Sequence, residues 1–203
     1  MAVNVDYYLA PQSPWVYLGH ARFVEMARAA GATVHVKPMD LGGQVFPVSG
    51  GLPLGQRAPQ RQAYRLVELA RFAKHLELPL HVQPRHFPVG GDPAALLIVA
   101  AQARLGAQAA LALTGAVTQA VWADQKDISD TAELQAMLVG LDLPLDLWEA
   151  SMSDATRAIY QANTDEAVSA GVFGAPTYAI DGELFWGQDR LDFVQRRLSV
   201  GAV

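Results

Sequence analysis

Ser13 is the residue near the start of the chain with the clearest chemical potential. It precedes Pro14, and from Trp15 onward apolar residues recur at helical spacing. A serine followed by a proline is typical of a helix N-cap and first helical position. The hydroxyl would lie at a helix N-terminus, where unpaired N–H groups favour negative charge. Two interpretations follow: Ser13 only caps the helix, or its hydroxyl faces a cleft and donates a hydrogen bond to an anion such as a thiolate.

Other reactive side chains are scarce in the 203 residues. The absence of cysteine excludes disulfides, thiol nucleophiles and cysteine-ligated metals. The five histidines include no pair spaced i, i+4 and no HExxH motif, so no metal is expected. His20 is expected to be a helix-surface or partly buried residue rather than a catalytic one. No phosphate-binding glycine motif and no Ser/His/Asp elbow is present.

The composition favours a globular protein with one large or two small domains. Hydrophobic residues make up 51% of the chain and the mean hydropathy is +0.14. The net charge is -5 without any Lys/Arg cluster, so nucleic acid is not an expected partner. Residues 105–123 lack charge but contain several polar residues, which favours buried helix over a membrane span. No signal-peptide pattern is recognised at the N-terminus, so a cytoplasmic location is expected.

The elements that position Ser13 begin with a strand. Alternation over residues 3–9 predicts this strand, which feeds the helix that starts at Pro14 and stops at Gly31. Residues 33–37 predict a second strand, parallel to the first. Residues 38–59 form a long Gly/Pro-rich connection, which is often functional. Helices are then expected over 60–76, 93–123 with a break at Gly106, 130–140, from 144, and from Asn163 to near Gly171.

Strands return near the end of the chain. Residues 177–180 and 183–186 predict two strands joined by an Asp181-Gly182 hairpin turn, and residues 191–198 predict a last helix. A βαβ unit and a ββα unit in one sheet predict an α/β thioredoxin-like fold with a large helical insertion. We predict a thioredoxin-like domain made of residues 1–41 and 171–203, and an inserted helical domain over residues 42–170.

Three segments carry a resemblance to a known family over essentially the whole chain. They are Ser13-Pro14-Trp15, residues 171–177 (GVFGAPT) and residues 185–191 (FWGQDRL). In this order and spacing, the chain resembles the 2-hydroxychromene-2-carboxylate isomerases, which belong with the kappa-class glutathione transferases. Both groups resemble the disulfide oxidoreductases of the thioredoxin superfamily.

The resemblance implies roles for five residues on the sheet side of the site. Ser13 would be catalytic, since it matches the serine whose hydroxyl hydrogen-bonds the sulfur of the cofactor glutathione. A cis bond between Ala175 and Pro176 would present backbone groups to glutathione. Gln188 and Asp189 would hold its γ-glutamyl end. From the residues alone, Pro176 could equally begin an edge strand in the trans form, and Asp189 could cap the last helix.

The helical side of the site departs from the family pattern. Arg61 matches a usual lysine and would hold a glutathione carboxylate. Trp15, Tyr64 and Trp186 are candidates for the substrate pocket. Leu52 aligns with a usual asparagine. The other departures are Glu68, which replaces a usual Asp, and residues 89–97, which lack a usual Asn and Arg.

The resemblance also implies an activity. The protein would interconvert 2-hydroxychromene-2-carboxylate and trans-o-hydroxybenzylidenepyruvate, a step of aromatic hydrocarbon breakdown. The glutathione thiolate would add to this small aromatic substrate, allow ring opening and bond rotation, and leave unchanged. A homodimer is expected. Two alternatives remain: a kappa-type glutathione transferase or peroxidase that consumes glutathione, and a non-enzymatic thioredoxin-like binding protein.

Overall fold

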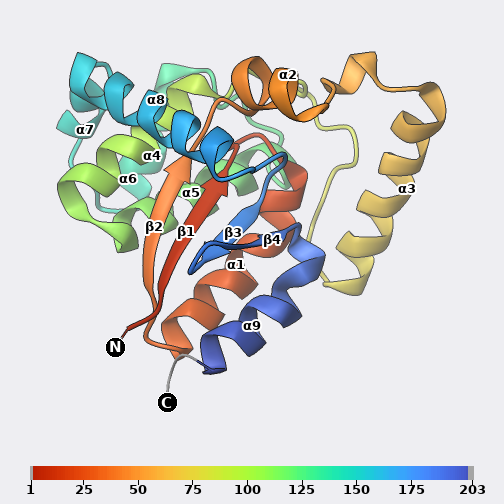
Figure 1. The fold of residues 1–203 in the computed structure, drawn as a ribbon. Helices are drawn as coiled ribbons and strands as arrows, with labels where there is room; N and C mark the ends of the chain where they lie inside the picture. Colours follow the sequence, from red (N-terminus) through yellow and green to blue (C-terminus); the bar gives the residue numbers. More distant parts are fainter. Residues whose placement is uncertain (1, 201–203) are drawn as a thin grey trace.

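A four-stranded sheet forms the centre of the protein (Figure 1). The computed structural model describes residues 2–200. β1 (Asn4–Leu9) pairs in parallel with β2 (Thr33–Pro38) and antiparallel with β3 (Thr177–Ile180), which pairs with β4 (Glu183–Trp186). The order across the sheet is β2-β1-β3-β4. The first and last parts of the chain therefore share one sheet, and the predicted thioredoxin-like fold is confirmed.

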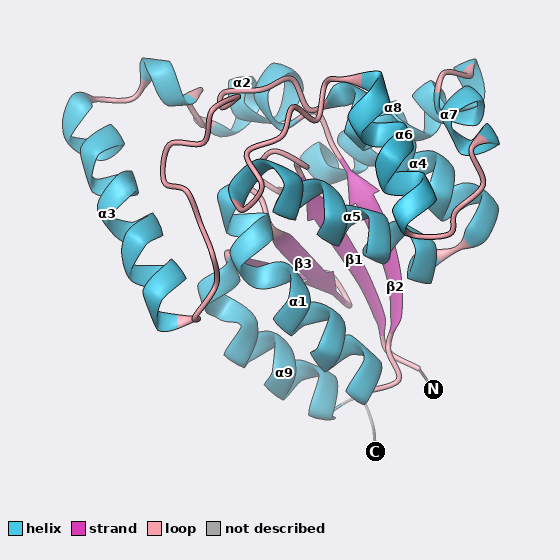
Figure 2. Cartoon of the chain, turned by 180° about the vertical axis from the view of Figure 1, so that it is seen from behind, coloured by secondary structure: helices cyan, strands magenta, loops and turns pink. Residues whose placement is uncertain are grey.

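Helices surround this sheet. α1 (Pro14–Ala29) and α9 (Leu191–Val200) lie side by side against it (Figure 2). α3 (Pro59–His75) stands apart from the sheet at the end of long loops in both views. The other helical segments are η1 (Leu41–Val45), α2 (Phe46–Ser49), η2 (Leu54–Gln56), α4 (Asp92–Leu105), α5 (Ala107–Trp122), α6 (Thr131–Gly140), α7 (Asp146–Ser151), α8 (Asp154–Ser169) and η3 (Gln188–Arg190). The two-domain division with its boundaries remains a prediction.

Most of the local signals act as predicted. Gly31 ends the first helix with a φ of 62°, which glycine adopts without strain. Asp181 and Gly182 both have positive φ, as the favoured hairpin turn requires. Gly106 separates α4 from α5. Asp130 caps α6, since its carboxylate accepts a hydrogen bond from the Ala132 N–H at 2.8 Å.

The predicted helix start at Asn163 is wrong. α8 begins at Asp154 and is capped by Ser153, so Asn163 lies inside the helix. The Asn163 side chain donates to the carbonyl of Pro38 at 3.3 Å, and the hydroxyl of Thr164 accepts from the Asp40 N–H at 3.0 Å. Small polar side chains of this kind can cap a helix. In this protein they bind the backbone at the end of β2 and just after it instead. Their pattern therefore marked a tertiary contact rather than a helix boundary.

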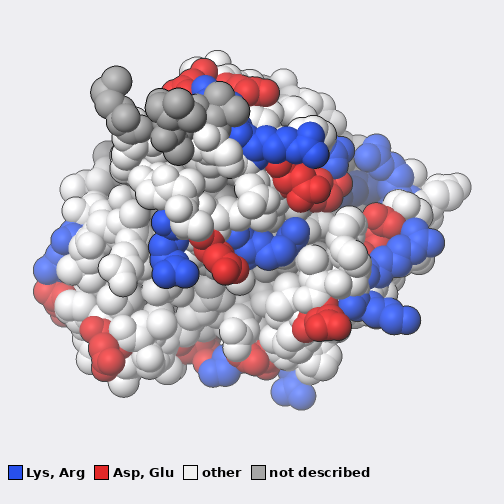
Figure 3. All heavy atoms as spheres, turned by 90° about the horizontal axis from the view of Figure 1, so that it is seen from below, with Lys and Arg blue, Asp and Glu red and all other residues white. Residues whose placement is uncertain are grey.

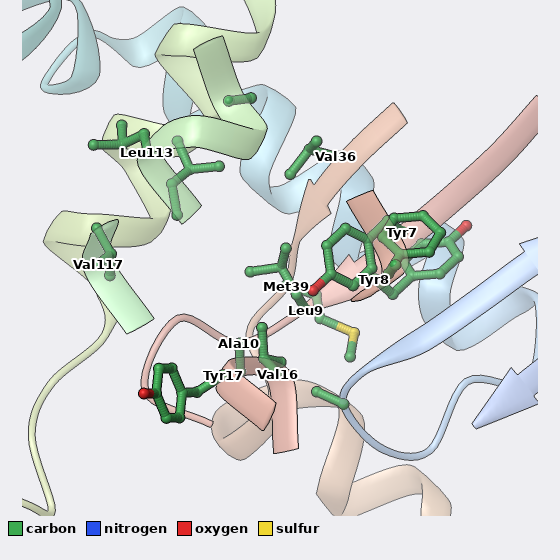
Figure 4. Packing of buried hydrophobic residues seen from close by; sticks show 14 of the residues in the cluster. Tyr7, Tyr8, Leu9, Ala10, Val16, Tyr17, Val36, Met39, Leu113 and Val117 are labelled. Carbon is green, nitrogen blue, oxygen red and sulfur yellow. The ribbon is translucent and has the colours of Figure 1, made fainter. Parts of the chain in front are cut away.

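Aromatic and aliphatic side chains form the core on the central strand. Tyr7 stacks on Tyr178 with ring centroids 5.2 Å apart and contacts Phe23 at 4.7 Å. All three side chains are fully buried. Figure 4 shows side chains from β1, β2, α1 and α5 gathered in this cluster. Tyr7 is therefore a central residue of the core.

Charged side chains cover a minor part of one face of the protein. On the face seen from below, uncharged atoms cover most of the area, and Lys or Arg side chains lie next to Asp or Glu (Figure 3). No helix in the described part of the chain combines the length and hydropathy needed to span a bilayer.

His20 is a buried part of this framework. Its Nε2 lies 3.0 Å from the carbonyl oxygen of Leu111, and its Nδ1 lies 3.3 Å from the hydroxyl of Tyr7. Because a carbonyl only accepts, Nε2 carries the proton and Nδ1 accepts from Tyr7. Burial lowers the pKa of His20 to about 4. His20 therefore joins α1 to α5 and β1 in its neutral form.

We expect His20 to make the fold acid-sensitive. Its pKa of about 4 lies below the ordinary value of about 6.5, so the unfolded chain binds more protons between these values. The free energy of unfolding should therefore fall as the pH drops from about 7 to 4.5, by roughly 2–3 kcal/mol from this residue. Urea unfolding at both pH values measures the loss. His20→Gln, which keeps a donor for Leu111, should show a smaller loss; equal losses in both proteins would contradict the assignment.

Gly19 permits close contact between α1 and η3. A Cβ at Gly19 would lie 2.8 Å from the Cβ of Gln188 and 3.2 Å from the hydroxyl of Tyr178. We expect Gly19→Ala to lower the free energy of unfolding by about 1–3 kcal/mol, the usual effect of overpacking. Gly140→Ala is the matched control, because its added Cβ meets no atom within 4 Å and alanine favours helix. Denaturant unfolding of both variants tests this; equal stability would show that the contact relaxes freely.

Candidate active site

Ser13 lies where β1 ends and α1 begins. Its Oγ accepts a hydrogen bond from the Val16 N–H at 3.4 Å, so the predicted cap is confirmed. The same Oγ donates to the carbonyl oxygen of Ala175 at 3.5 Å, the long limit of a hydrogen bond. The side chain is 9% exposed. The hydroxyl is thus held at a helix N-terminus by weak contacts, and its proton can be redirected to a stronger acceptor.

The segment opposite Ser13 contains the predicted cis bond. The Ala175–Pro176 peptide bond is cis, so the alternative prediction of a trans bond is wrong. The carbonyl of Pro176 accepts from the Gly187 N–H at 2.8 Å, and the hydroxyl of Thr177 donates to the Gly174 carbonyl at 2.8 Å. These bonds fix the segment at the start of β3. The structure therefore brings Ser13 and Ala175 together from distant parts of the sequence.

An exposed aromatic pair lies beside this segment. Trp186 is 49% exposed and packs edge-on against Phe173, which is 43% exposed, with ring centroids 4.7 Å apart. A Cβ at Gly174 would lie 2.2 Å from the indole Nε1 of Trp186, so any side chain there would displace this ring. Trp186 was predicted to line the substrate pocket, whereas Phe173 was not among the predicted site residues. The position of Phe173 inside the GVFGAP segment is the sequence feature that could have identified it.

Gln188 and Asp189 are adjacent in sequence but differ in environment. The side chain of Gln188 is buried, and its Oε1 accepts from the guanidinium of Arg22, which also donates to the Gln188 carbonyl at 3.2 Å. Asp189 is about half exposed and pairs with Arg190 at 2.5 Å. The N-cap residue of η3 is Gly187, and capping of the last helix by Asp189 stays an alternative prediction. Of the two side chains, only that of Asp189 is open to a ligand.

The helical side of the site is built on α3. Trp15 of α1 contacts Phe72 of α3 edge-on, with ring centroids 6.0 Å apart, and this contact brings α3 to the start of α1. Tyr64 is 57% exposed, and Arg61 is exposed as well. The side chain of Arg61 makes no hydrogen bond or ion pair within residues 2–200, and the guanidinium of Arg71 lies over the ring of Tyr64 at 6.0 Å. Their proposed contacts with a ligand stay predictions.

Arg65 is the main feature that sequence reasoning missed. This arginine of α3 is 9% exposed, and its guanidinium lies over the rings of Phe87 and Trp122 at 5.1 and 5.5 Å. Its spacing of four residues from Arg61 was the available signal, because residues at i and i+4 share a helix face.

A metal site and a deep pocket elsewhere in the protein are the two other kinds of site to consider. No group of three or more potential metal ligands occurs among the described residues. A hollow of about 490 Å³ lies between α1 and α5, lined by residues such as His20, Leu111 and Gly115. None of the predicted site residues lines it, so the chemistry is expected at the Ser13 end of α1 instead.

Comparisons with known proteins agree with this arrangement. The model of the DsbA-like thioredoxin domain matches residues 4–199. A 2-hydroxychromene-2-carboxylate isomerase of Sphingobium xenophagum is 30% identical, over 98% of this chain and 99% of that protein. One from Pseudomonas sp. (strain C18) is 28% identical, over 94% and 88%. A solved structure of a 2-hydroxychromene-2-carboxylate isomerase superposes with a TM-score of 0.77 at 25% identity, over 97% of this chain and 94% of that chain.

The family model and the relatives cover nearly the same residues, and these include the Ser13 turn, the cis-proline segment and α3. The chain therefore belongs to the DsbA-like thioredoxin-domain family and, within it, to the 2-hydroxychromene-2-carboxylate isomerases.

Proposed function

We propose that the protein is a glutathione-dependent isomerase that interconverts 2-hydroxychromene-2-carboxylate and trans-o-hydroxybenzylidenepyruvate. The observation that carries this proposal is the Ser13 hydroxyl at the N-terminus of α1, beside the cis Ala175–Pro176 segment. In a chain without cysteine, this hydroxyl occupies a position that favours a thiolate supplied from outside.

The residues at this end of the sheet fit glutathione. Ser13 offers a hydroxyl whose hydrogen bond to Ala175 is long enough to be exchanged for one to sulfur. Asp189 offers a partly exposed carboxylate for the α-ammonium group, and Arg61 offers an exposed guanidinium for a carboxylate. When bound, glutathione supplies a thiolate that can add reversibly to a conjugated substrate.

Each of these residues has a separate task in the proposal. The Ser13 hydroxyl and the α1 N-terminus stabilise negative charge at sulfur, which favours the thiolate at neutral pH. Gln188 holds its loop to α1 through Arg22, so that Asp189 faces the ligand. The aromatic side chains of Trp15, Tyr64 and Trp186 border the space where a flat substrate would bind.

The alternative functions differ in the fate of glutathione. An isomerase returns it unchanged, whereas a transferase forms a stable conjugate and a peroxidase oxidises it. Leu52 is the observation that favours a binding protein, because it is 48% exposed where the family usually has an asparagine. The expected homodimer and cytoplasmic location belong to the proposal and rest on the family resemblance and the N-terminal sequence pattern.

Ser13→Ala should impair ionisation of the bound thiol. We expect glutathione to bind the wild-type protein with release of a proton above neutral pH, and the variant to release fewer protons. Loss of one unit of thiol pKa depression corresponds to about 1.4 kcal/mol, so turnover should fall about tenfold or more. Calorimetry in two buffers of different ionisation enthalpy counts the protons, and the change in substrate absorbance gives the turnover.

Matched controls separate this effect from general damage. Ser169→Ala changes an exposed serine at the end of α8 and should behave as the wild type. S-methylglutathione has no thiol proton and should bind wild type and Ser13→Ala equally. Absence of glutathione binding to the wild-type protein at millimolar concentration would exclude the proposal. Recovery of a stable conjugate in place of free glutathione would favour a transferase.

A further inference from the structure

Arg65 is a buried cation without a counter-charge in the described chain. Its side chain is more than nine-tenths buried, yet no carboxylate of residues 2–200 pairs with its guanidinium. Arginine is almost never buried unless it is paired. Removing a charged guanidinium from water costs free energy. A negatively charged partner from outside the chain would offset this cost.

The contacts of Arg65 leave its donors free. Phe87 and Trp122 lie beneath the guanidinium, and such cation–π contact offsets part of the lost hydration. It uses none of the five N–H donors. The guanidinium nitrogens of Arg65 make no hydrogen bond within residues 2–200. None of them is completely enclosed by protein atoms either. The donors therefore reach solvent from an otherwise covered side chain.

The neighbours of Arg65 make its surroundings positive. Arg57 lies before α3, donates to the Leu52 carbonyl at 2.8 Å and packs over Phe46. Burial, assisted by the charge of Arg57, lowers the pKa of Arg65 to about 10, which still leaves it protonated at neutral pH. Arg61 is one helical turn away on the same face. Three arginines thus lie in or just before the first half of α3, where their charges influence one another, a setting that favours an anion.

The position of Arg65 links this setting to Ser13. Trp122, on which the guanidinium lies, donates its indole N–H to the carbonyl oxygen of Gln12 at 3.3 Å. Gln12 immediately precedes Ser13. One aromatic residue therefore connects the buried cation to the turn that carries the reactive hydroxyl.

We propose that Arg65 is the residue that binds the carboxylate of the substrate, an acid that carries an aromatic ring; this assignment rests on the proposed function. The fork of the guanidinium matches a carboxylate bidentately. Arg61 is exposed at the outer end of the same face and holds the cofactor's carboxylate, whereas Arg65 lies deeper, among aromatic rings. The site then orients an acid by one charged contact while the rings accept its flat body.

Binding of a simple aromatic acid, without glutathione, tests the assignment. We expect trans-cinnamate to bind the wild-type protein about tenfold or more tightly than neutral cinnamamide, as a charged hydrogen-bonded contact predicts. Arg65→Gln and Arg65→Met should remove this preference, with little change for the amide. Arg104→Gln is the matched control, because Arg104 lies on another helix, α4, where it is exposed and paired with Asp146. Calorimetry gives all the affinities.

Thermal unfolding and kinetics separate binding from a structural role. Arg65→Met keeps an apolar side chain on the two rings and removes an unpaired buried charge, so its melting temperature should be no lower than that of the wild type. In the isomerisation assay, KM should rise about tenfold or more with little change in kcat. A role in packing alone would lower the melting temperature and leave KM unchanged.

The outcomes also separate this assignment from the proposed function. Equal binding of acid and amide to the wild-type protein, or no binding of either, would overturn the role of Arg65. So would a loss of glutathione affinity in Arg65→Gln, since this would place the cofactor's carboxylate there. The preference for the acid over the amide could depend on Arg65 while no isomerisation is found. That result would support the binding site and contradict the isomerase proposal.

Discussion

The pairing of β1 on both of its edges is the constraint on which the rest of the structure depends. β1 pairs with β2, close in sequence, and with β3, far along the chain. The antiparallel pairing of Tyr8 with Thr177 places the end of β1 beside the start of β3. Ser13 and the cis Ala175–Pro176 segment therefore meet because the sheet forms. Long-range pairings of this kind fix a site more rigidly than loops alone can.

The charged groups around Ser13 include no thiol from the chain itself. The N-terminus of α1, Arg61 and Arg65 all favour negative charge, while Asp189 favours an ammonium group. In the proposed function, the chain would therefore contribute mainly orientation and electrostatic stabilisation, and a bound molecule would contribute the reactive atom. The relatives of this chain are named as isomerases, which agrees with this proposed division.

The sequence was sufficient to predict the elements that depend on local signals. Ser13, Gly31, Gly106 and the Asp181-Gly182 turn each determine backbone geometry within a few residues, and all were predicted correctly. Asn163 could not be interpreted in the same way, because its side chain binds Pro38 in another element. The burial of Arg65 was equally inaccessible, since its ring partners come from a loop and from α5. Which polar residue is buried depends on the packing of distant segments, which periodicity does not reveal.

The separation of α3 from the sheet has an evolutionary consequence. α3 extends from the body on two long loops, and within residues 59–75 only Arg65 and Leu69 are buried (Figure 1). Replacements on this helix therefore disturb few core contacts, whereas replacements around Ser13 affect the central sheet. If α3 borders the substrate as proposed, substrate preference can change there at little cost in stability, whereas changes at the Ser13 end of the sheet also alter buried contacts. The differences from the family pattern at Arg61 and Glu68 lie on this helix, that at Leu52 lies in the loop before it, and those in residues 89–97 extend into the buried part of α4.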